Sequence, residues 1–298
     1  MVQSVTIHLI VHMQIGFAYV NLLKEGKRHT LKMNKSASRS MDILNLLAKS
    51  RKPLTQLEVS QMLDLPKSST FELLYTLLEK GILEFDNKDL KTFKLSLRVF
   101  EIGMTVLENA ELPRIARPIL EKLSSEIGET VFLAVENVDE IVYLDRIEEH
   151  TSITSSVGLG IRRPMYCTAL GKAMLATYSE TRIKDIWDMV DPKAIYTKNT
   201  ISNYDDFIVD LQATRKRGYA IDNREVEDKT FCVAAPIYGR ADTAVGAISI
   251  AIVYLKADKK KVAILGKAIM NSALAISKRL GFLRDTLYFD REVSNSHQ

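Results

Sequence analysis

Residues 65-LPKSSTFELLYTLLEKG-81 predict one short helix with well-marked ends. Pro66 suits the first position of a helix, and Gly81 suits the left-handed residue that follows the last turn. A second helix is expected just upstream, in TQLEVSQMLDL, where Thr55 can cap the first turn with Glu58 as its capping-box partner. Two short helices at this spacing are typical of a helix-turn-helix.

The sequence on either side favours a winged form of this motif. An apolar stripe that begins at Ser38 predicts a preceding helix, and ILEF and TFKLSL predict a hairpin around the polar turn DNKD. A plain three-helix bundle would account for the helices. It would not explain the hairpin, or the Ser and Thr residues at the start of the third helix. We therefore expect residues 33–95 to form a winged helix-turn-helix DNA-binding domain.

Composition indicates an ordinary chain of about two domains. Of its 298 residues, 46% are hydrophobic and 26% charged. Cys167 and Cys232 lack CxxC spacing, so the sequence indicates neither a disulfide scaffold nor a zinc site. His150 alone lies between the first 32 residues and the tail, which argues against histidine catalysis or a histidine metal site. No metal ion and no cofactor are expected, and a reducing cytoplasm is the expected location.

The first 32 residues allow three interpretations. Residues 5–17 are apolar, but His8, His12 and Gln14 interrupt them and the alternation has a period of two. The preferred interpretation is a start-site extension, with Met33 as the beginning of the protein. An additional strand or arm is the second interpretation. A membrane anchor is the third and fits least well, because no basic residue precedes the apolar segment.

The rest of the chain predicts an α+β domain. Residues 96–112 are expected to form a linker helix, with Pro113 at its end or at a domain boundary. Residues 113–285 then alternate helices with strands that read as an antiparallel sheet, and residues 286–298 form a tail. The predicted strands are TVFLAVEN, EIVYLDRIE, TFCVAAPIYG and AVGAISIAIV; the predicted helices include RIARPILEKLSSEI, ALGKAMLATY and residues 256–281.

Several catalytic motifs can be excluded. The GK of ALGKA is not a P-loop, because Tyr166 occupies the position of the first glycine and Ala173 that of Ser or Thr. Neither cysteine has an evident activating partner. The carboxylates of DNREVED are best explained as a solvated acidic loop. We therefore expect no catalytic residue and no enzymatic activity.

One loop-helix and one strand remain as a candidate ligand site. In 164-PMYCTALGKA-173, Thr168 can cap a helix whose first N–H groups would attract a carboxylate, and small residues would let a ligand approach. The strand 230-TFCVAAPIYG-239 is equally rich in small residues. A packed helix and strand without any ligand would show the same pattern.

The chain resembles the IclR (isocitrate lyase regulator) family of bacterial transcription regulators over residues 38–285. The resemblance rests on SRSMDILNLLAKSRKPLTQLEVSQMLDLPKSSTFELLYTLLEKG, GETVFLAV, EIVYLDRIE, GIRRPMYCTALGKAMLA and RKRGYAIDNREVEDKTFCVAAPIYG, in this order. It implies a winged helix that binds double-stranded operator DNA. It also implies a linker helix that supports a homodimer or a dimer of dimers, and a GAF-like domain that binds a small organic-acid effector. No membrane contact is implied.

The resemblance also implies the effector-binding residues. Ala169 and Leu170 would hold a carboxylate through their backbone N–H groups, and Asp222 and Ser249 would bind hydroxyl or carbonyl groups. The remaining members of the expected pocket are Cys232 and the wall residues Met165, Thr230 and Phe231. The chain departs from the family at Lys229, usually Gly, and at Ala251, where some relatives have Ser.

For DNA, a regulator must contact phosphates and read bases. Residues 33–98 carry eleven Lys and Arg against eight Asp and Glu, so the basic excess lies at this end of the chain. Glu72 stands where the family typically has Arg, and it could accept a hydrogen bond from cytosine N4. The other expected DNA-contacting residues are Arg39, Thr55, Lys67, Ser68, Ser69, Thr70, Lys88, Lys91 and Lys94. The alternatives are a binding module that has lost DNA recognition and, with less support, an enzyme.

Overall fold

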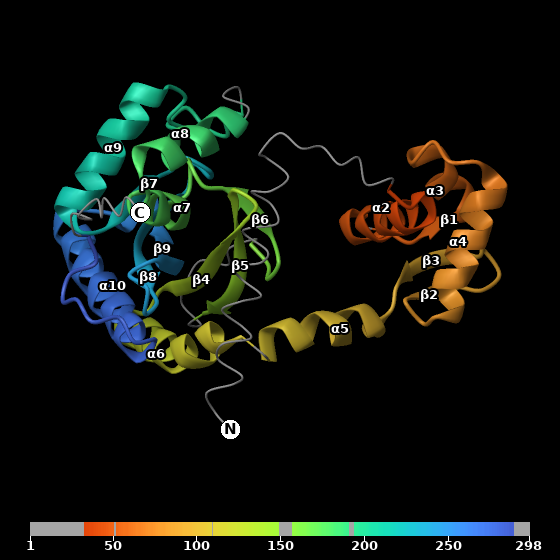
Figure 1. Cartoon of the computed structure of the whole chain (residues 1–298), viewed down its shortest axis with the longest axis horizontal. Helices are drawn as coiled ribbons and strands as arrows, with labels where there is room; N and C mark the ends of the chain where they lie inside the picture. Colours follow the sequence, from red (N-terminus) through yellow and green to blue (C-terminus); the bar gives the residue numbers. More distant parts are fainter. Residues whose placement is uncertain (1–32, 51, 109, 149–156, 191–193, 289–298) are drawn as a thin grey trace, which may run out of the picture. The chain divides into compact units, whose positions relative to one another are not determined.

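The computed structural model describes residues 33–50, 52–108, 110–148, 157–190 and 194–288, and the chain divides into two compact units between Met104 and Thr105 (Figure 1). The predictions for residues 1–32, and for the tail beyond residue 288, lie outside these ranges. Within them, each helix is too short or too polar to cross a lipid bilayer.

The first unit is a winged helix-turn-helix, as predicted. Its helices are α2 (Lys35–Lys49), α3 (Gln56–Met62) and α4 (Lys67–Glu79); its strands are β1 (Leu54–Thr55), β2 (Leu83–Asn87) and β3 (Thr92–Leu95). The strands form an antiparallel sheet in the order β1-β3-β2. Apolar side chains from every element meet in one core: Ile43, Leu47, Leu54, Val59, Leu74, Leu83 and Phe93.

The ends of α3 and α4 follow the sequence signals. Thr55 and Glu58 form the predicted capping box, in which the Thr55 N–H donates to Glu58 Oε2 over 2.8 Å. Asp64 adopts a left-handed φ of 49° in the turn between the two helices. Gly81 has a φ of 69° just after α4, which is the conformation that favours glycine at this position.

Two further helices carry the chain into the second unit. Residues 97–108 form α5 (Leu97–Glu108), and α6 (Glu111–Ile127) follows directly. The unit boundary falls inside α5. Pro113 therefore lies in the first turn of α6 rather than at the end of a helix, a position where its missing N–H breaks no helical hydrogen bond. Gly128, with a φ of 68°, ends α6 as predicted.

The second unit is built on one antiparallel sheet of six strands in the order β6-β5-β4-β9-β8-β7 (Figure 1). The strands are β4 (Thr130–Asn137), β5 (Glu140–Ile147), β6 (Arg162–Pro164), β7 (Ala220–Asn223), β8 (Thr230–Tyr238) and β9 (Ala244–Val253). The helices beyond α6 are α7 (Ala169–Leu175), α8 (Glu180–Met189), α9 (Tyr204–Arg217) and α10 (Lys259–Arg279), with a short 3₁₀ turn, η1 (Tyr254–Lys256), after β9.

The two faces of this sheet carry side chains of different size. On one face, large aliphatic residues of β8 and β9, such as Val233, Ile248 and Ile250, pack against α6 and α10. On the other face, the same strands present Ala234, Ala247 and other small residues toward α7. Side chains alternate between the two faces of a strand, so large and small residues alternate along the sequences of β8 and β9. The small residues leave room for α7 and for a cavity beside it.

Candidate functional sites

Helix α4 is held against α3 by polar contacts to its first residue and to the turn that precedes it. The Gln56 side-chain amide donates to the carbonyl of Lys67 over 2.9 Å, and the Ser60 hydroxyl donates to the carbonyl of Leu65 over 2.7 Å. Leu74 is completely buried on the inner side of α4. The helix is therefore fixed by one face, and its opposite face is left to solvent.

The solvent face of α4 carries the residues that can reach a nucleic acid. Lys67, Ser68 and Glu72 are exposed, and the Glu72 carboxylate has no recorded partner among the described residues. Phe71 is also exposed, and its ring packs on Tyr75 with the ring centroids 4.2 Å apart. This face thus combines a cation, a hydroxyl, an acceptor and an apolar ring, which are the groups that contact phosphates and base edges.

Three of the predicted DNA-contacting side chains have partners within the protein. Thr70 is completely buried and its hydroxyl donates to the carbonyl of Pro66 over 3.0 Å, so it cannot reach a phosphate. The Thr55 hydroxyl is used in the capping box. Lys94 lies within 3.4 Å of Glu84 and 3.1 Å of Asp86, and these contacts raise the pKa of its ammonium group.

The remaining predicted DNA contacts differ in their exposure. Lys88 and Lys91 are exposed in the turn between β2 and β3, whereas Arg39 on α2 and Ser69 on α4 are half-buried. The wing therefore offers two lysines that are free of an ion pair among the described residues, instead of the three expected from the sequence. Phosphate contacts from the wing would depend on this turn.

A cavity of about 500 Å³, its open mouth included, lies on the small-residue face of the six-stranded sheet. The lining comes from every strand of the sheet, from the segment before β6, from the start of α7 and from the loop between β7 and β8: Phe132, Tyr143, Val157, Arg163, Thr168, Ala169, Leu170, Asp222, Val226, Glu227, Thr230, Cys232, Ser249 and Ala251.

The start of α7 is fixed at the cavity by its cap and by a close backbone contact. The Thr168 hydroxyl accepts from the Gly171 N–H and donates to the carbonyl of Pro164, both over 3.1 Å. A Cβ on Gly171 would stand 2.2 Å from the Met165 carbonyl oxygen, so only glycine fits this contact. The first N–H groups of α7, at Ala169 and Leu170, have no acceptor within the helix and lie at the cavity wall.

Asp222 is a buried carboxyl group in this cavity. Burial, and next the negative charge of Glu225, raise the pKa of Asp222 to about 7. One of its oxygens accepts from the Glu225 N–H over 2.6 Å. Its neighbour across the strands is Cys232, whose pKa is raised well above the usual value by burial. The thiol therefore stays protonated, in line with the expectation that it is not a nucleophile.

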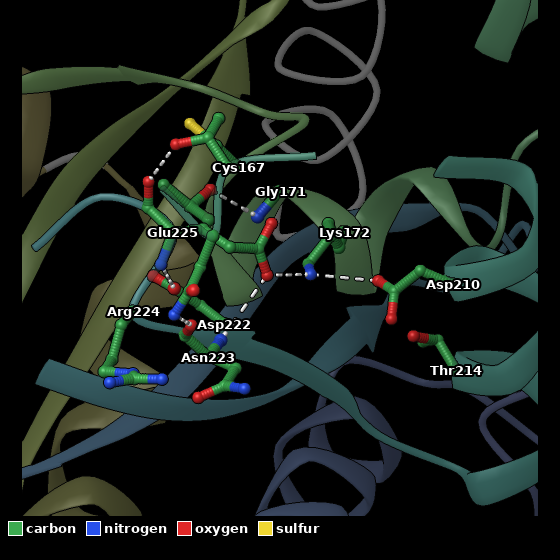
Figure 2. Close-up of polar contacts among 12 residues, drawn as sticks. Cys167, Gly171, Lys172, Asp210, Thr214, Asp222, Asn223, Arg224 and Glu225 are labelled. Atoms are coloured by element: carbon green, nitrogen blue, oxygen red, sulfur yellow. Dashed lines mark hydrogen bonds and ion pairs between the residues drawn. The ribbon is translucent and has the colours of Figure 1, made fainter. Parts of the chain in front are cut away.

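A buried ion cluster joins α7, α9 and the loop after β7 (Figure 2). The Lys172 ammonium on α7 is 2.5 Å from Glu225 Oε1, in the loop after β7, and 2.9 Å from Asp210 Oδ2 on α9. Burial alone would lower the pKa of Lys172, but the two carboxylates outweigh it and the pKa is raised. The Thr200 hydroxyl donates to the carbonyl of Glu225 over 2.6 Å and fixes the same loop from another side. Two of the three segments that the cluster joins, α7 and the loop after β7, also contribute residues to the cavity lining.

Both units match known family models. The first matches the IclR helix-turn-helix domain over residues 36–87, and the second matches the bacterial transcriptional regulator IclR C-terminal domain over residues 104–278. The chain belongs to the IclR family of DNA-binding transcriptional regulators.

Individual relatives agree with this assignment. The regulator BhcR of Paracoccus denitrificans is 30% identical over 245 residues, which are 82% of this chain and 86% of BhcR. The crystal structure of the Thermotoga maritima IclR has a TM-score of 0.70 at 30% identity and covers 83% of this chain and 99% of its own. The curated relatives are named as transcriptional regulators, as expected for a family of non-enzymatic regulators.

A third relative has the same fold with a ligand bound. The structure of an IclR homologue from Microbacterium hydrocarbonoxydans, complexed with 4-hydroxybenzoate, has a TM-score of 0.70 at 20% identity. It covers 82% of this chain and 98% of its own. At this identity it shows that the fold is shared.

The cavity includes six of the eight residues predicted as effector contacts: Ala169, Leu170, Asp222, Thr230, Cys232 and Ser249. Met165 lies outside the lining, because it is completely buried beneath Gly171. Phe231 also lies outside, because it belongs to the opposite face of β8 and packs with Val233 on the α6 and α10 side.

Sequence reasoning missed Arg163 and the two aromatic residues of the wall, Phe132 and Tyr143. The period-two alternation of β4 and β5 could have placed the aromatic residues on the small-residue face. Arg163 lies on β6, a three-residue strand that no sequence pattern indicated. Val226 and Glu227 also line the cavity. They belong to the segment DNREVED, for which the sequence predicts a solvated loop.

Proposed function

We propose that this protein controls transcription of a catabolic operon by binding operator DNA through α4, and that an organic acid in the cavity changes this binding. The observation that carries the proposal is the cavity itself. It lies in the IclR C-terminal unit, and it is lined by backbone amides, an arginine and carboxyl groups next to small apolar residues. Such a mixture of a few polar groups in an apolar pocket is typical of small-molecule sites.

The DNA part of the proposal rests on the solvent face of α4. Lys67 and Ser68 lie at its first turn, where side chains and helix amides can contact phosphates. Glu72 lies one turn further on, where it can reach a base edge and accept from cytosine N4. Lys88 and Lys91 add positive charge on the wing. Together they supply the two kinds of contact that sequence-specific binding requires.

The effector part rests on the charge of the cavity. Arg163 and the first amides of α7 favour an anionic ligand such as a carboxylate. The related protein from Microbacterium hydrocarbonoxydans, which binds 4-hydroxybenzoate, supports the same ligand class. An effector that binds one arrangement of the regulator better than another shifts the population toward that arrangement. We infer a homodimer or a dimer of dimers that works in the cytoplasm.

The test is a gel mobility shift with the DNA immediately upstream of the protein's own gene. We expect a specific shift that resists competition by unrelated DNA, and we expect an effective acid to change the fraction of DNA bound. A folded protein that produces no shift at low salt would overturn the DNA part. That result would favour a binding module that has lost DNA recognition.

A further inference from the structure

Phe71 is an exposed aromatic residue on α4, the second helix of the helix-turn-helix. It is 46% exposed, although phenylalanine is among the residues that proteins most often bury. A partner that covers the ring would be bound more tightly, because apolar surface would leave water. The place of the ring on the helix indicates which partner covers it.

The exposed positions at the start of α4 form two neighbouring stripes along the helix. Lys67 and Phe71 lie on one stripe, and Ser68 and Glu72 lie on the other with the same spacing of four residues. Leu74 is completely buried on the inner side. The second helix of a helix-turn-helix lies in the major groove, so its exposed face meets the base edges. Phe71 and Glu72 are therefore side by side on the face that reads DNA.

The Phe71 ring is held by a column of aromatic side chains that ends in the core. It packs on Tyr75, one turn further along α4, with the ring centroids 4.2 Å apart. Tyr75 in turn contacts Phe85 on β2 and Phe93 on β3, at centroid distances of 6.3 and 5.9 Å. Phe93 is buried in the core of the first unit. Because the exposed ring is backed by packed side chains, contact with DNA immobilises it at little cost in conformational entropy.

The major groove offers an apolar group to such a ring at one kind of base. Thymine presents its C5-methyl group there, whereas the other base edges present hydrogen-bond donors and acceptors. An aromatic ring cannot satisfy those polar groups, so covering them costs free energy. A ring that reaches the base edges therefore favours thymine, and contact with the methyl group would cover the exposed part of Phe71.

We propose that Phe71 reads thymine through its methyl group, beside the base that Glu72 contacts. The inference rests on the proposed function, since it assigns a base to a residue of the DNA-binding helix. Consecutive helix residues are about 1.5 Å apart along the axis and neighbouring bases about 3.4 Å, so the two contacts fall within about two base pairs. The stretch of operator that one α4 covers thus contains this thymine, on either strand.

The experiment removes the methyl group from the DNA and keeps every hydrogen-bonding group. Sites are selected from a random DNA library with the full chain, and each thymine of a selected site is then replaced in turn by deoxyuridine. Fluorescence anisotropy gives the dissociation constants. We expect about fourfold weaker binding at one thymine in the stretch that each α4 covers, as the loss of one methyl contact would cause. The other thymines should show no comparable change.

Variants show whether the methyl preference comes from Phe71. In Phe71→Ala, the site with the sensitive thymine and its deoxyuridine form should bind equally, whereas Phe71→Leu should retain part of the preference. Met41→Ala is the matched control, because Met41 is 57% exposed but lies on α2, and it should leave the fourfold ratio unchanged. Both DNA forms are compared within each variant, so a general change in affinity cancels. Circular dichroism confirms that each variant is folded.

Equal binding of all deoxyuridine forms to the parent chain would overturn the inference and leave the DNA part of the proposed function intact. So would selected sites that share no thymine, or a methyl preference that persists unchanged in folded Phe71→Ala. A folded parent chain that selects no sequence from the library would overturn the proposed function and the inference with it. Loss of the ratio in Phe71→Ala but not in Met41→Ala would confirm that Phe71 sets one base of the operator.

Discussion

Glu72 stands on the exposed face of α4, one turn beyond the predicted phosphate contacts. If it accepts a hydrogen bond from a cytosine, Glu72→Ala should lower affinity for the preferred site and relax selection at one base pair, by about 1–3 kcal/mol of discrimination. Selection from a random DNA library, followed by affinity measurements on the selected sites, would detect this change.

Glu79→Ala is the matched control for this experiment. Glu79 is equally exposed but belongs to the last turn of α4, so its removal changes the charge of the helix without removing the proposed base contact. If Glu72→Ala tightens binding to every sequence to the same extent as Glu79→Ala, then Glu72 is a repulsive charge and reads no base.

The raised pKa of Asp222 makes the free energy of unfolding depend on pH. Its pKa rises from the ordinary 3.8 to about 7 on folding, so the folded chain holds a proton that the unfolded chain has lost between these values. The free energy of unfolding therefore falls as pH rises through this window, by at most about 1.4 kcal/mol per pH unit, and the full cost remains above pH 7. Asp222→Asn removes the ionisation and keeps an acceptor for Glu225.

The expected result is a stability advantage of Asp222→Asn that grows from pH 4 to pH 7 and is constant at higher pH. Urea unfolding at a series of pH values would measure it. Asp228→Asn, on the exposed part of the same loop, should show no such trend. A difference between Asp222→Asn and the parent chain that does not change with pH would contradict the assigned pKa.

At the scale of helices and strands, prediction succeeded where a pattern is repeated several times. The alternation in β4 and β5 and the positive φ values of Val138 and Asp139 between them agree with the predicted hairpin. The capping box of Thr55 and Glu58 correctly predicted the start of α3, and Gly128 correctly predicted the end of α6. Such signals depend only on neighbouring residues, so they can be recognised in a sequence before its fold is known.

The short strands could not be predicted in this way. The strands β1, β6 and β7 have two to four residues, too few to show a period, and each exists because a distant strand offers it hydrogen bonds. This also explains the gaps in the predicted site. Without β6 no face could be assigned to Arg163. Phe231 is a different case, because the alternation along β8 already places it with Val233 and opposite Cys232.

The Lys172 cluster connects α7, α9 and the loop after β7, and it provides a test at this scale. Lys172→Met would leave the buried Glu225 without its cation, and breaking such a pair costs about 3–5 kcal/mol. We expect a large loss in the free energy of unfolding, measured by urea denaturation at neutral pH. The double variant Lys172→Met/Glu225→Gln removes the stranded charge and should recover part of the loss.

An exposed ion pair serves as the control for the cluster. Lys184 and Asp188 are paired one turn apart on the surface of α8, and Lys184→Met should change stability by less than about 1 kcal/mol. If Lys172→Met has an equally small effect, or if the double variant is no more stable than the single one, the cluster does not hold α7, α9 and the loop after β7 together.

The whole molecule consists of two units with separate cores, and α5 contains the boundary between them. In a transcription regulator this division places DNA contacts and ligand contacts in different cooperative units, so ligand binding can stabilise one unit directly and reach the other through a change of arrangement. The chain should therefore unfold in two steps, since the packing of either unit can be lost while that of the other remains.

Matched core truncations test this independence by differential scanning calorimetry. Leu74 on α4 and Ile250 on β9 are both completely buried, and replacing either with alanine should cost about 2–5 kcal/mol. We expect Leu74→Ala to lower the melting temperature of one transition and Ile250→Ala to lower that of the other. A ligand of the cavity should raise the transition that Ile250→Ala lowers. A single transition that both variants shift to the same extent would show that the two cores unfold together.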